Sequence, residues 1–297
     1  AQDIYLTGNP QITFFKVVYR RHTNFSMESI QQTWSGTATA TGGDRVTATI
    51  SRNGDLVHRM YLQSLQLDAG SNKNHGAAYI TDVELEIGGQ KIDKHTGSWM
   101  EAWAELTEPN PGGVVGSPDG ETGTVFQRMT NMGGMADAVT GTGKYFFIPL
   151  RFWFCENPGL ALPLIALQYH EVKVILNTAA SLTGGGDSTL WCDYIYLDTD
   201  ERRRFAQVSH EYLITQVQHQ SYATGKATLD LNFNHPVKEL VWTGEWTGGI
   251  FTTLTASDTY QLKLNGHDRF AARDRDYFTL AQVWQYHSGY GSIDPAS

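Results

Sequence analysis

Few residues in this 297-residue chain have the types and spacing that catalysis requires. Glu84 and Glu86 are the nearest approach to a catalytic pair of carboxylates. They stand two positions apart in the segment 79–94, so on a strand their side chains share one face. No other chemical group accompanies them in this segment, and we therefore expect a solvated strand face there.

The ten histidines are scattered and do not predict a metal site. His170-Glu171 and His267-Asp268 are adjacent pairs, and on a strand the members of each pair point to opposite faces. The chain has no His-Glu-x-x-His motif, no Gly-x-Ser-x-Gly elbow and no phosphate-binding glycine loop. We predict no catalytic, cofactor-binding or metal-binding residues and no cofactor, so the protein is not expected to be an enzyme.

Two kinds of covalent modification are conceivable, at the two cysteines and at one asparagine. Cys155 and Cys192 lie in the apolar segments FWFCEN and LWCDYIY, and we predict buried free thiols there, with a disulfide as the alternative. Asn24 begins the glycosylation sequon Asn-Phe-Ser. The opening sequence AQDIYLTGNP lacks the pattern of a secretory signal, so we do not expect Asn24 to carry a glycan.

The composition favours an all-β protein. The chain contains 30 glycines, aromatic residues make up 12% of it, and only 18% of its residues are charged. The formal net charge is −9, whereas a protein that coats nucleic acid is expected to be basic. We therefore expect no direct nucleic-acid binding.

The segment 143–177 organises the predicted fold. It is rich in aromatic and β-branched residues, and Pro149, Pro158 and Pro163 exclude a continuous helix. We expect two or three core strands joined by tight corners there. The strongest helix signal lies at 98–106, where apolar residues recur at i, i+3, i+4 and i+7.

Alternating or apolar runs predict further strands, and glycine-rich stretches predict loops. The long stretch 107–142 reads as a surface insertion, and 200–204 reads as a charged joint between domains. The strands are expected at 27–34, 45–50, 56–67, 79–94 and 190–198, and in the segments FAQVSHEYLITQVQ, LDLNFNHPVKELVW and YQLKLNGHDRFAARDRDYF after residue 204.

A weak internal repeat indicates two similar β domains. Residues 83–91 align with residues 260–268, and both copies turn at a glycine, Gly89 and Gly266. Few residues follow the second copy, and nothing there matches 143–177. We expect either that this sequence is a fragment or that other chains complete the second sheet.

Several motifs carry a resemblance to a known family. The run NPGLALPLIALQYHEV at 157–172 resembles the signature of the major capsid proteins of large icosahedral DNA viruses, especially the phycodnaviruses of algae. The runs LTGNPQITFFK and YRR near the start, RNGDL at 52–56, and HDRFAARD are similar to that family as well. The resemblance covers nearly all of 1–285 and departs from the family in the loops 69–78, 107–142 and 243–258.

The resemblance implies an all-β fold of two consecutive jelly-roll β-sandwich domains, the second incomplete at its C-terminus. It implies an N-terminal arm at 1–26, a first jelly roll at 27–200 and a truncated second jelly roll at 201–297. The implied function is that of a structural protein of the virion's outer shell, assembled in the host cytoplasm. Its implied partners are two further copies in a pseudo-hexameric homotrimer, neighbouring capsomers, minor capsid proteins beneath the shell and an internal viral membrane nearby.

Two other classes remain as alternatives to the capsid interpretation. One is a two-domain β-sandwich lectin that stacks sugars on Trp242 and Trp246. The other is a β-sandwich hydrolase, which would need a clustered pair of acids that the sequence does not show. The state of assembly distinguishes a lectin, which can be a monomer, from a capsomer.

Overall fold

The computed structural model describes residues 23–38, 43–66, 74–112, 122–135, 144–179, 187–223, 225–252, 254–255 and 257–291. Of the predicted arm at 1–26, the residues 1–22 lie outside these ranges. Among the described residues, no helix has the length and apolar character needed to cross a membrane.

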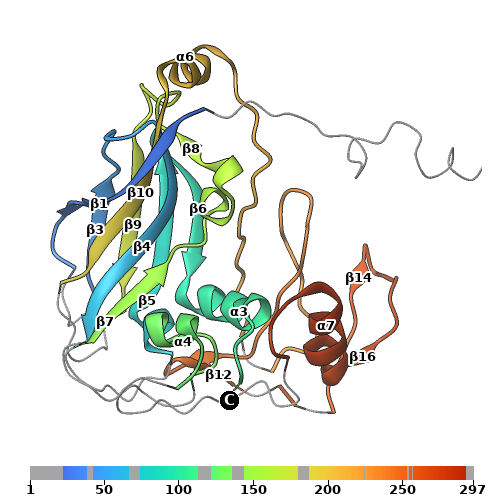
Figure 1. The fold of residues 1–297 in the computed structure, drawn as a ribbon. Coiled ribbons are helices and arrows are strands. Elements are labelled where there is room, and N and C mark those ends of the chain that lie inside the picture. Colours follow the sequence, from blue (N-terminus) through green and yellow to red (C-terminus); the bar gives the residue numbers. More distant parts are fainter. Residues whose placement is uncertain are drawn as a thin grey trace, which may run out of the picture.

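Residues up to 197 form two antiparallel sheets packed face to face (Figure 1). The first, which we call the aromatic sheet, has the order β1-β10-β4-β7, with β8 paired to β4. Its strands are β1 (Phe25–Gln32), β10 (Thr189–Leu197), β4 (Leu56–Gln66), β7 (Lys144–Pro149) and β8 (Leu162–Pro163). The second, which we call the charged sheet, has the order β2-β3-β9-β5-β6. Its strands are β2 (Trp34–Ser35), β3 (Arg45–Thr49), β9 (Val172–Thr178), β5 (Ile80–Ile87) and β6 (Gln90–Thr96).

Period-two alternation places one face of each strand in the core between the sheets. On β9, Val172, Val174 and Leu176 are buried, as their spacing predicts. On β7, Phe146 and Ile148 are buried from the opposite side. The result is a two-sheet sandwich of the jelly-roll kind, with one continuous hydrophobic core.

The organising segment 143–177 departs from the prediction at one point. It contributes β7, β8 and β9, but the aromatic run between β7 and β8 is a helical turn, α5 (Trp153–Glu156), followed by the short helix η1 (Pro158–Leu160). Phe152 and Phe154 are fully buried and their rings stack 5.8 Å apart. Trp153 is buried as well, and a helical turn allows all three rings to enter the core, whereas a strand would direct Trp153 to the face opposite Phe152 and Phe154.

Three helices pack at one end of the sandwich (Figure 1). They are α2 (His75–Tyr79), α3 (Gly97–Thr107) and α4 (Val125–Thr130). Helix α3 confirms the helix predicted at 98–106. The expectation of a surface insertion at 107–142 is wrong for residues 130–135, all of which are buried. The backbone amides of Gly133 and Gly134 can be buried there because they bond to the Glu101 side chain, as described below.

The predicted joint at 200–204 lies in helix α6 (Thr199–Gln207), and the chain beyond it differs most from prediction. Within the described residues, the segment between α6 and residue 245 contains no strand, although the sequence pattern predicts strands in it. A strand needs a partner for its backbone groups, and this segment meets the charged sheet in only a few polar contacts. Gln216 Nε2 donates to the Ile92 carbonyl at 2.6 Å, and the Val217 amide donates to Asp93 Oδ1 at 3.0 Å.

Short paired elements follow in the C-terminal segment. The pairs are β11 (Trp246–Thr247) with β12 (Ile250–Phe251), β13 (Thr259–Tyr260) with β16 (Arg273–Asp274), and β14 (Lys263–Leu264) with β15 (His267–Asp268). The β14–β15 hairpin turns at Asn265 and Gly266, which both have positive φ, as a tight Asn-Gly turn requires. A π-helix, η2 (Tyr277–Gln282), and α7 (Val283–Tyr286) complete the described chain.

Candidate assembly site

The groups considered for catalysis are separated from one another and engaged locally. Glu84 is bound by Lys91 at 2.6 Å and by Lys94 at 3.3 Å on the outer face of the charged sheet. Glu171 pairs with Lys173, and Asp268 pairs with Lys263 across the β14–β15 hairpin. Among the described residues, no group of three or more His, Cys, Asp or Glu side chains could hold a metal ion.

Both cysteines are free thiols, as the sequence predicts. Cys192 is buried within β10, and Cys155 lies on α5 against the same core. Burial raises the pKa of the Cys155 thiol to about 12, and burial also raises the pKa of Cys192 well above its ordinary value. Both sulfurs are therefore protonated and unreactive near neutral pH.

The outer faces of the two sheets have opposite characters. On the charged sheet, Lys94 reaches Asp82 at 3.0 Å and Glu84 at 3.3 Å, in a network of ion pairs that is typical of a face in contact with water. The aromatic sheet instead presents a row of four rings, Trp191, Tyr61, Phe147 and Tyr145, on its outer face.

The four rings form a continuous strip across β10, β4 and β7. The Tyr61 ring stacks on Trp191 with centroids 6.3 Å apart and planes 3° apart, and it meets Phe147 at 6.2 Å. Tyr145 is 51% exposed and Phe147 is 36% exposed. At the other end of this face, Phe205 of α6 packs on a small cluster formed by Leu56, Ala161 and Ile195. The described residues cover one end of the face and leave the aromatic strip open.

A junction joins the helical end of the sandwich to the C-terminal segment. The Gly289 amide donates to the Leu106 carbonyl at 2.8 Å, and the Ser288 hydroxyl donates to the Thr107 carbonyl. Both carbonyls lie in the last turn of α3, where they have no partner within the helix. Asn74 bridges the same region, because its Nδ2 donates to the Gly249 carbonyl at 2.9 Å and its Oδ1 accepts from the Met135 amide at 2.7 Å.

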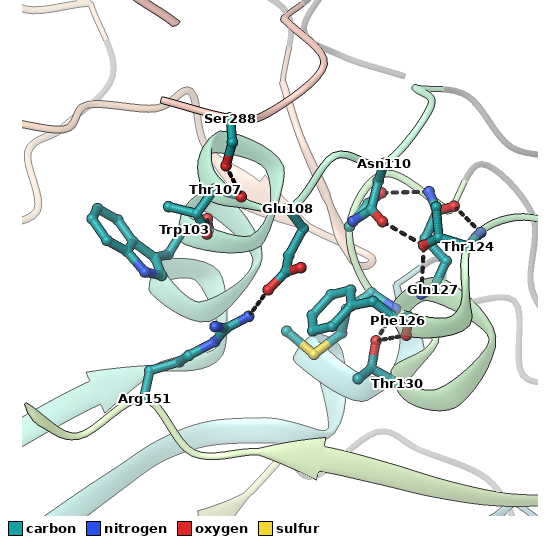
Figure 2. A network of polar contacts seen from close by, with 12 residues as sticks. Trp103, Thr107, Glu108, Asn110, Thr124, Phe126, Gln127, Thr130, Arg151 and Ser288 are labelled. Atoms are coloured by element: carbon teal, nitrogen blue, oxygen red, sulfur yellow. Dashed lines mark hydrogen bonds and ion pairs between the residues drawn. The ribbon is translucent and has the colours of Figure 1, made fainter. Parts of the chain in front are cut away.

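Figure 2 shows the Ser288–Thr107 contact of this junction and, beside it, a polar network around α4. Thr124 and Gln127 form a capping box at the start of α4, and Gln127 Nε2 also donates to the carbonyls of Pro111 and Gly133. The Thr124 hydroxyl donates to Asn110 Oδ1 at 2.5 Å. These hydrogen bonds connect the start of α4 to Asn110, Pro111 and Gly133, so they tie the loops on both sides of the helix to it.

A cavity of about 220 Å³ lies between α3 and the C-terminal segment 239–291. The rings of Trp242, Tyr260 and Phe278 cluster on its wall, with Trp242 and Phe278 centroids 4.8 Å apart. Trp246 packs separately on Phe251, with centroids 4.7 Å apart. Both tryptophans named as candidate sugar platforms are therefore engaged in aromatic contacts within the protein.

A two-sheet antiparallel sandwich with this strand order defines a β protein of the jelly-roll class. The comparisons with known proteins identify the family. Residues 13–198 match the family described as the N-terminus of the major capsid protein, and residues 201–248 match the large eukaryotic DNA virus major capsid protein. The chain belongs to this family of major capsid proteins.

Curated relatives agree over most of the chain. The major capsid protein of Pyramimonas orientalis virus is 53% identical over 97% of this chain and 74% of its own length. The major capsid protein of Paramecium bursaria Chlorella virus 1 is 40% identical over 100% of this chain and 77% of its own. That of Phaeocystis pouchetii virus is 44% identical over 86% of this chain, and the match spans 59% of the relative.

Solved structures give the same result. The PBCV-1 VP54 crystal structure, fitted into a reconstruction of the virophage Sputnik, matches 96% of this chain and 79% of its own, with a TM-score of 0.76 and 34% identity. A quasi-atomic model of the PBCV-1 capsid matches with the same TM-score and covers 82% of that chain. The predicted fold class, double jelly roll, is confirmed, and the lectin alternative finds no support.

The sequence analysis missed the residues that build the junction. Glu101 lies in the predicted helix and Asn74 lies within the predicted loop 69–78, and neither stood out by type or spacing. The one available signal was Glu101 itself, an acid between Met100 and Ala102 in a helix whose only other charged residue is Glu105. An acid in that setting is either exposed or bonded to a buried partner. The structure shows Glu101 buried, with its carboxyl group accepting a hydrogen bond from the Gly133 amide.

Proposed function

We propose that this chain builds the outer shell of an icosahedral capsid as a homotrimeric capsomer. The observation that carries the proposal is the aromatic strip of Trp191, Tyr61, Phe147 and Tyr145. It lies on the outer face of a sandwich whose core is already buried between the two sheets. Aromatic residues are enriched at the centres of protein interfaces, and charged residues are depleted there. In a shell made of one abundant protein, the surface available to cover this strip belongs to another copy.

The proposed domain organisation accounts for the trimer. We place the first jelly roll at 27–200 and the second at 201–297, and the two family matches, which change over between residues 198 and 201, support this boundary. Two jelly rolls from each of three chains give a pseudo-hexagonal capsomer, and closed threefold symmetry makes that number natural. Such capsomers pack against neighbouring capsomers in the shell.

Further partners belong to the same proposal. The arm at 1–26 faces the inside of the shell, where minor capsid proteins join capsomers from beneath and an internal viral membrane lies nearby. The net charge of −9 supports an outer layer that does not bind the genome directly. Assembly takes place in the host cytoplasm, and the two free thiols are compatible with a reducing compartment.

We also propose that the chain has no catalytic role and that Asn24 is unmodified. Asn24 is exposed immediately before β1, so a glycan could be accommodated there. Mass spectrometry of the peptide that contains Asn24, isolated from virions, is expected to give the unmodified mass. A heavier peptide that loses sugar units on fragmentation would contradict this assignment.

Native mass spectrometry of the full-length protein tests the trimer. We expect a three-chain species, and we expect the double variant Tyr145→Ser/Phe147→Ser to be mainly monomeric. The matched control is Lys91→Ser/Lys94→Ser on the charged sheet, which should remain trimeric. A monomeric wild-type protein would overturn the trimer, and a trimeric strip variant would show that the interface lies elsewhere.

A further inference from the structure

Helix α3 carries a carboxyl group in a fully buried position. Glu101 has 0% of its surface exposed. Its Oε1 accepts hydrogen bonds from the amides of Gly133 at 2.9 Å and Gly134 at 2.8 Å, and its Oε2 accepts from Gly133 at 3.0 Å. These bonds tie the buried loop 130–135 to α3. Among the described residues, no ion pair reaches Glu101.

Glu105 lies one helical turn further along α3 and is hydrogen-bonded to Glu101. It also lines the cavity between α3 and the segment 239–291, so the pair sits where the two parts of the molecule meet. A hydrogen bond between two carboxyl groups requires one proton, because two carboxylates have no donor between them. Burial raises the pKa of Glu101 to about 7, and burial together with the negative charge of Glu101 raises the pKa of Glu105 well above its ordinary value.

We infer that Glu101 and Glu105 share one proton and that this shared proton latches the loop 130–135 and the C-terminal segment 239–291 onto α3. The pair acts as a unit, as two carboxyl groups in one site do. Loss of the proton would leave two negative charges one helical turn apart in a buried site. The protein can relieve that repulsion only by admitting water, which means separating the loop or the C-terminal segment from α3.

The neighbouring ionisable groups supply no positive charge that would replace the shared proton. From the C-terminal segment, His287 faces the cavity but is paired with Glu239 at 2.6 Å, and burial raises the pKa of Tyr260, which also lines the cavity. Arg275 also lines the cavity, where it bonds to the Leu254 carbonyl and pairs with Asp276.

Three other elements pack on α3: α2 and β6, which carry the histidines described next, and β5, whose Asp82 and Glu84 are paired with Lys94 of β6. From α2, the buried His75 has its pKa lowered to about 4 by burial, so it carries no charge near neutral pH. From β6, His95 is paired with Asp93 at 3.0 Å, and its ring lies 6.5 Å from that of Trp99. Among the described residues, none of these groups forms an ion pair with Glu101 or Glu105.

The direction of the pH dependence follows from the sign of the shift. Because both folded-state pKa values are raised, the folded junction holds the proton more tightly than an open chain does. The contribution of the latch is therefore complete below the ordinary glutamate pKa and is lost as pH rises through the folded values. We expect the junction to open more readily in mildly alkaline solution.

Hydrogen exchange of the full chain between pH 6 and 9, corrected for intrinsic exchange rates, tests the latch. Peptides containing Gly133 and Gly134 should lose protection by about tenfold per pH unit once the pair loses its proton, while peptides of β9 should not. The variant Glu105→Gln keeps a hydrogen-bond donor toward Glu101 but removes the second acid, so its protection should fall less steeply with pH than that of the wild type. The control Glu108→Gln removes the same charge at the end of α3, where Glu108 pairs with Arg151 at 2.7 Å, and should keep the wild-type slope.

Infrared spectroscopy of the wild-type protein supplies a second test that needs no variant to fold. A shared proton gives a carbonyl stretch of a protonated carboxylic acid at pH 7, and that band should disappear over the pH range in which exchange protection falls. The inference is overturned if the band is absent at pH 7, or if protection at Gly133 and Gly134 is the same at pH 6 and 9. The inference does not depend on the proposed trimeric capsomer, because both measurements report on contacts within one chain.

Discussion

Replacing Gly289 with alanine should release the C-terminal segment from α3. A Cβ atom at this position would lie 2.1 Å from the Glu105 carbonyl oxygen and 2.6 Å from that of Leu106. Both oxygens are backbone atoms of the packed helix α3, so the C-terminal segment must move away and the helix stays in place. Movement breaks the bond from the Gly289 amide to Leu106 and the bond from Ser288 to Thr107.

The expected cost can be worked out from these two bonds. A typical hydrogen bond contributes about 1 kcal/mol net, so losing both costs about 2 kcal/mol and makes opening of the junction roughly 30-fold more frequent. The sandwich has its own core, so its unfolding should change little. The effect is therefore local, and a measurement that reports on single segments is needed to see it.

Hydrogen exchange resolved by peptide provides that measurement. Protection of residues 283–291 should fall roughly 30-fold in Gly289→Ala, whereas β9 and β10 keep their wild-type protection. Gly112→Ala is the matched control, because a Cβ there meets only ring atoms of Tyr290 at 3.3 and 3.4 Å, and a side chain at the surface can rotate away. Equal protection in wild type and Gly289→Ala would refute the assignment of this junction.

Three further changes test other parts of the chain. Phe154→Ala empties a fully buried site in the core and should cost about 3–5 kcal/mol in the free energy of unfolding measured with denaturant; a loss below 1 kcal/mol would mean that the site collapses around the gap. Cys155 and Cys192 should resist iodoacetamide at pH 8 in the native protein and react once it is unfolded, and fast labelling of the native protein would contradict their raised pKa values. Asp55→Ala should destabilise the sandwich more than Arg202→Ala, because the Asp55 carboxylate binds both Arg202 and the Leu197 amide; equal melting temperatures would argue against this.

Local signals in the sequence predicted local structure well. The alternation at Val172, Val174 and Leu176 correctly predicted a strand with one buried face, and the period of the segment 98–106 correctly predicted α3. The Asn265-Gly266 dipeptide lies at the tip of a hairpin. In each case a few neighbouring residues carry all the information, because the period or the turn geometry is set within one element.

The junction could not be predicted because its partners are distant in sequence. Asn74 adopts a left-handed conformation and bonds to Met135 and Gly249, which lie 61 and 175 positions away. An asparagine within a loop is usually interpreted as a turn residue, and nothing in its neighbourhood distinguishes this one. The same holds for Glu101, whose partners Gly133 and Gly134 come from a loop that reads as surface.

The contrast between β7 and β9 argues that the aromatic strip is covered in the assembled protein. On β9, one face lies in the core, and the other face carries the polar residues Lys173 and Asn177 beside Ile175. On β7, Tyr145 and Phe147 alternate with Phe146 and Ile148, so the strand is apolar on both faces. A strand that is apolar on both faces is expected to be buried on both, yet the described residues bury only one. We therefore expect another molecule to cover the open face, and the family to which the chain belongs makes another capsid protein the expected neighbour.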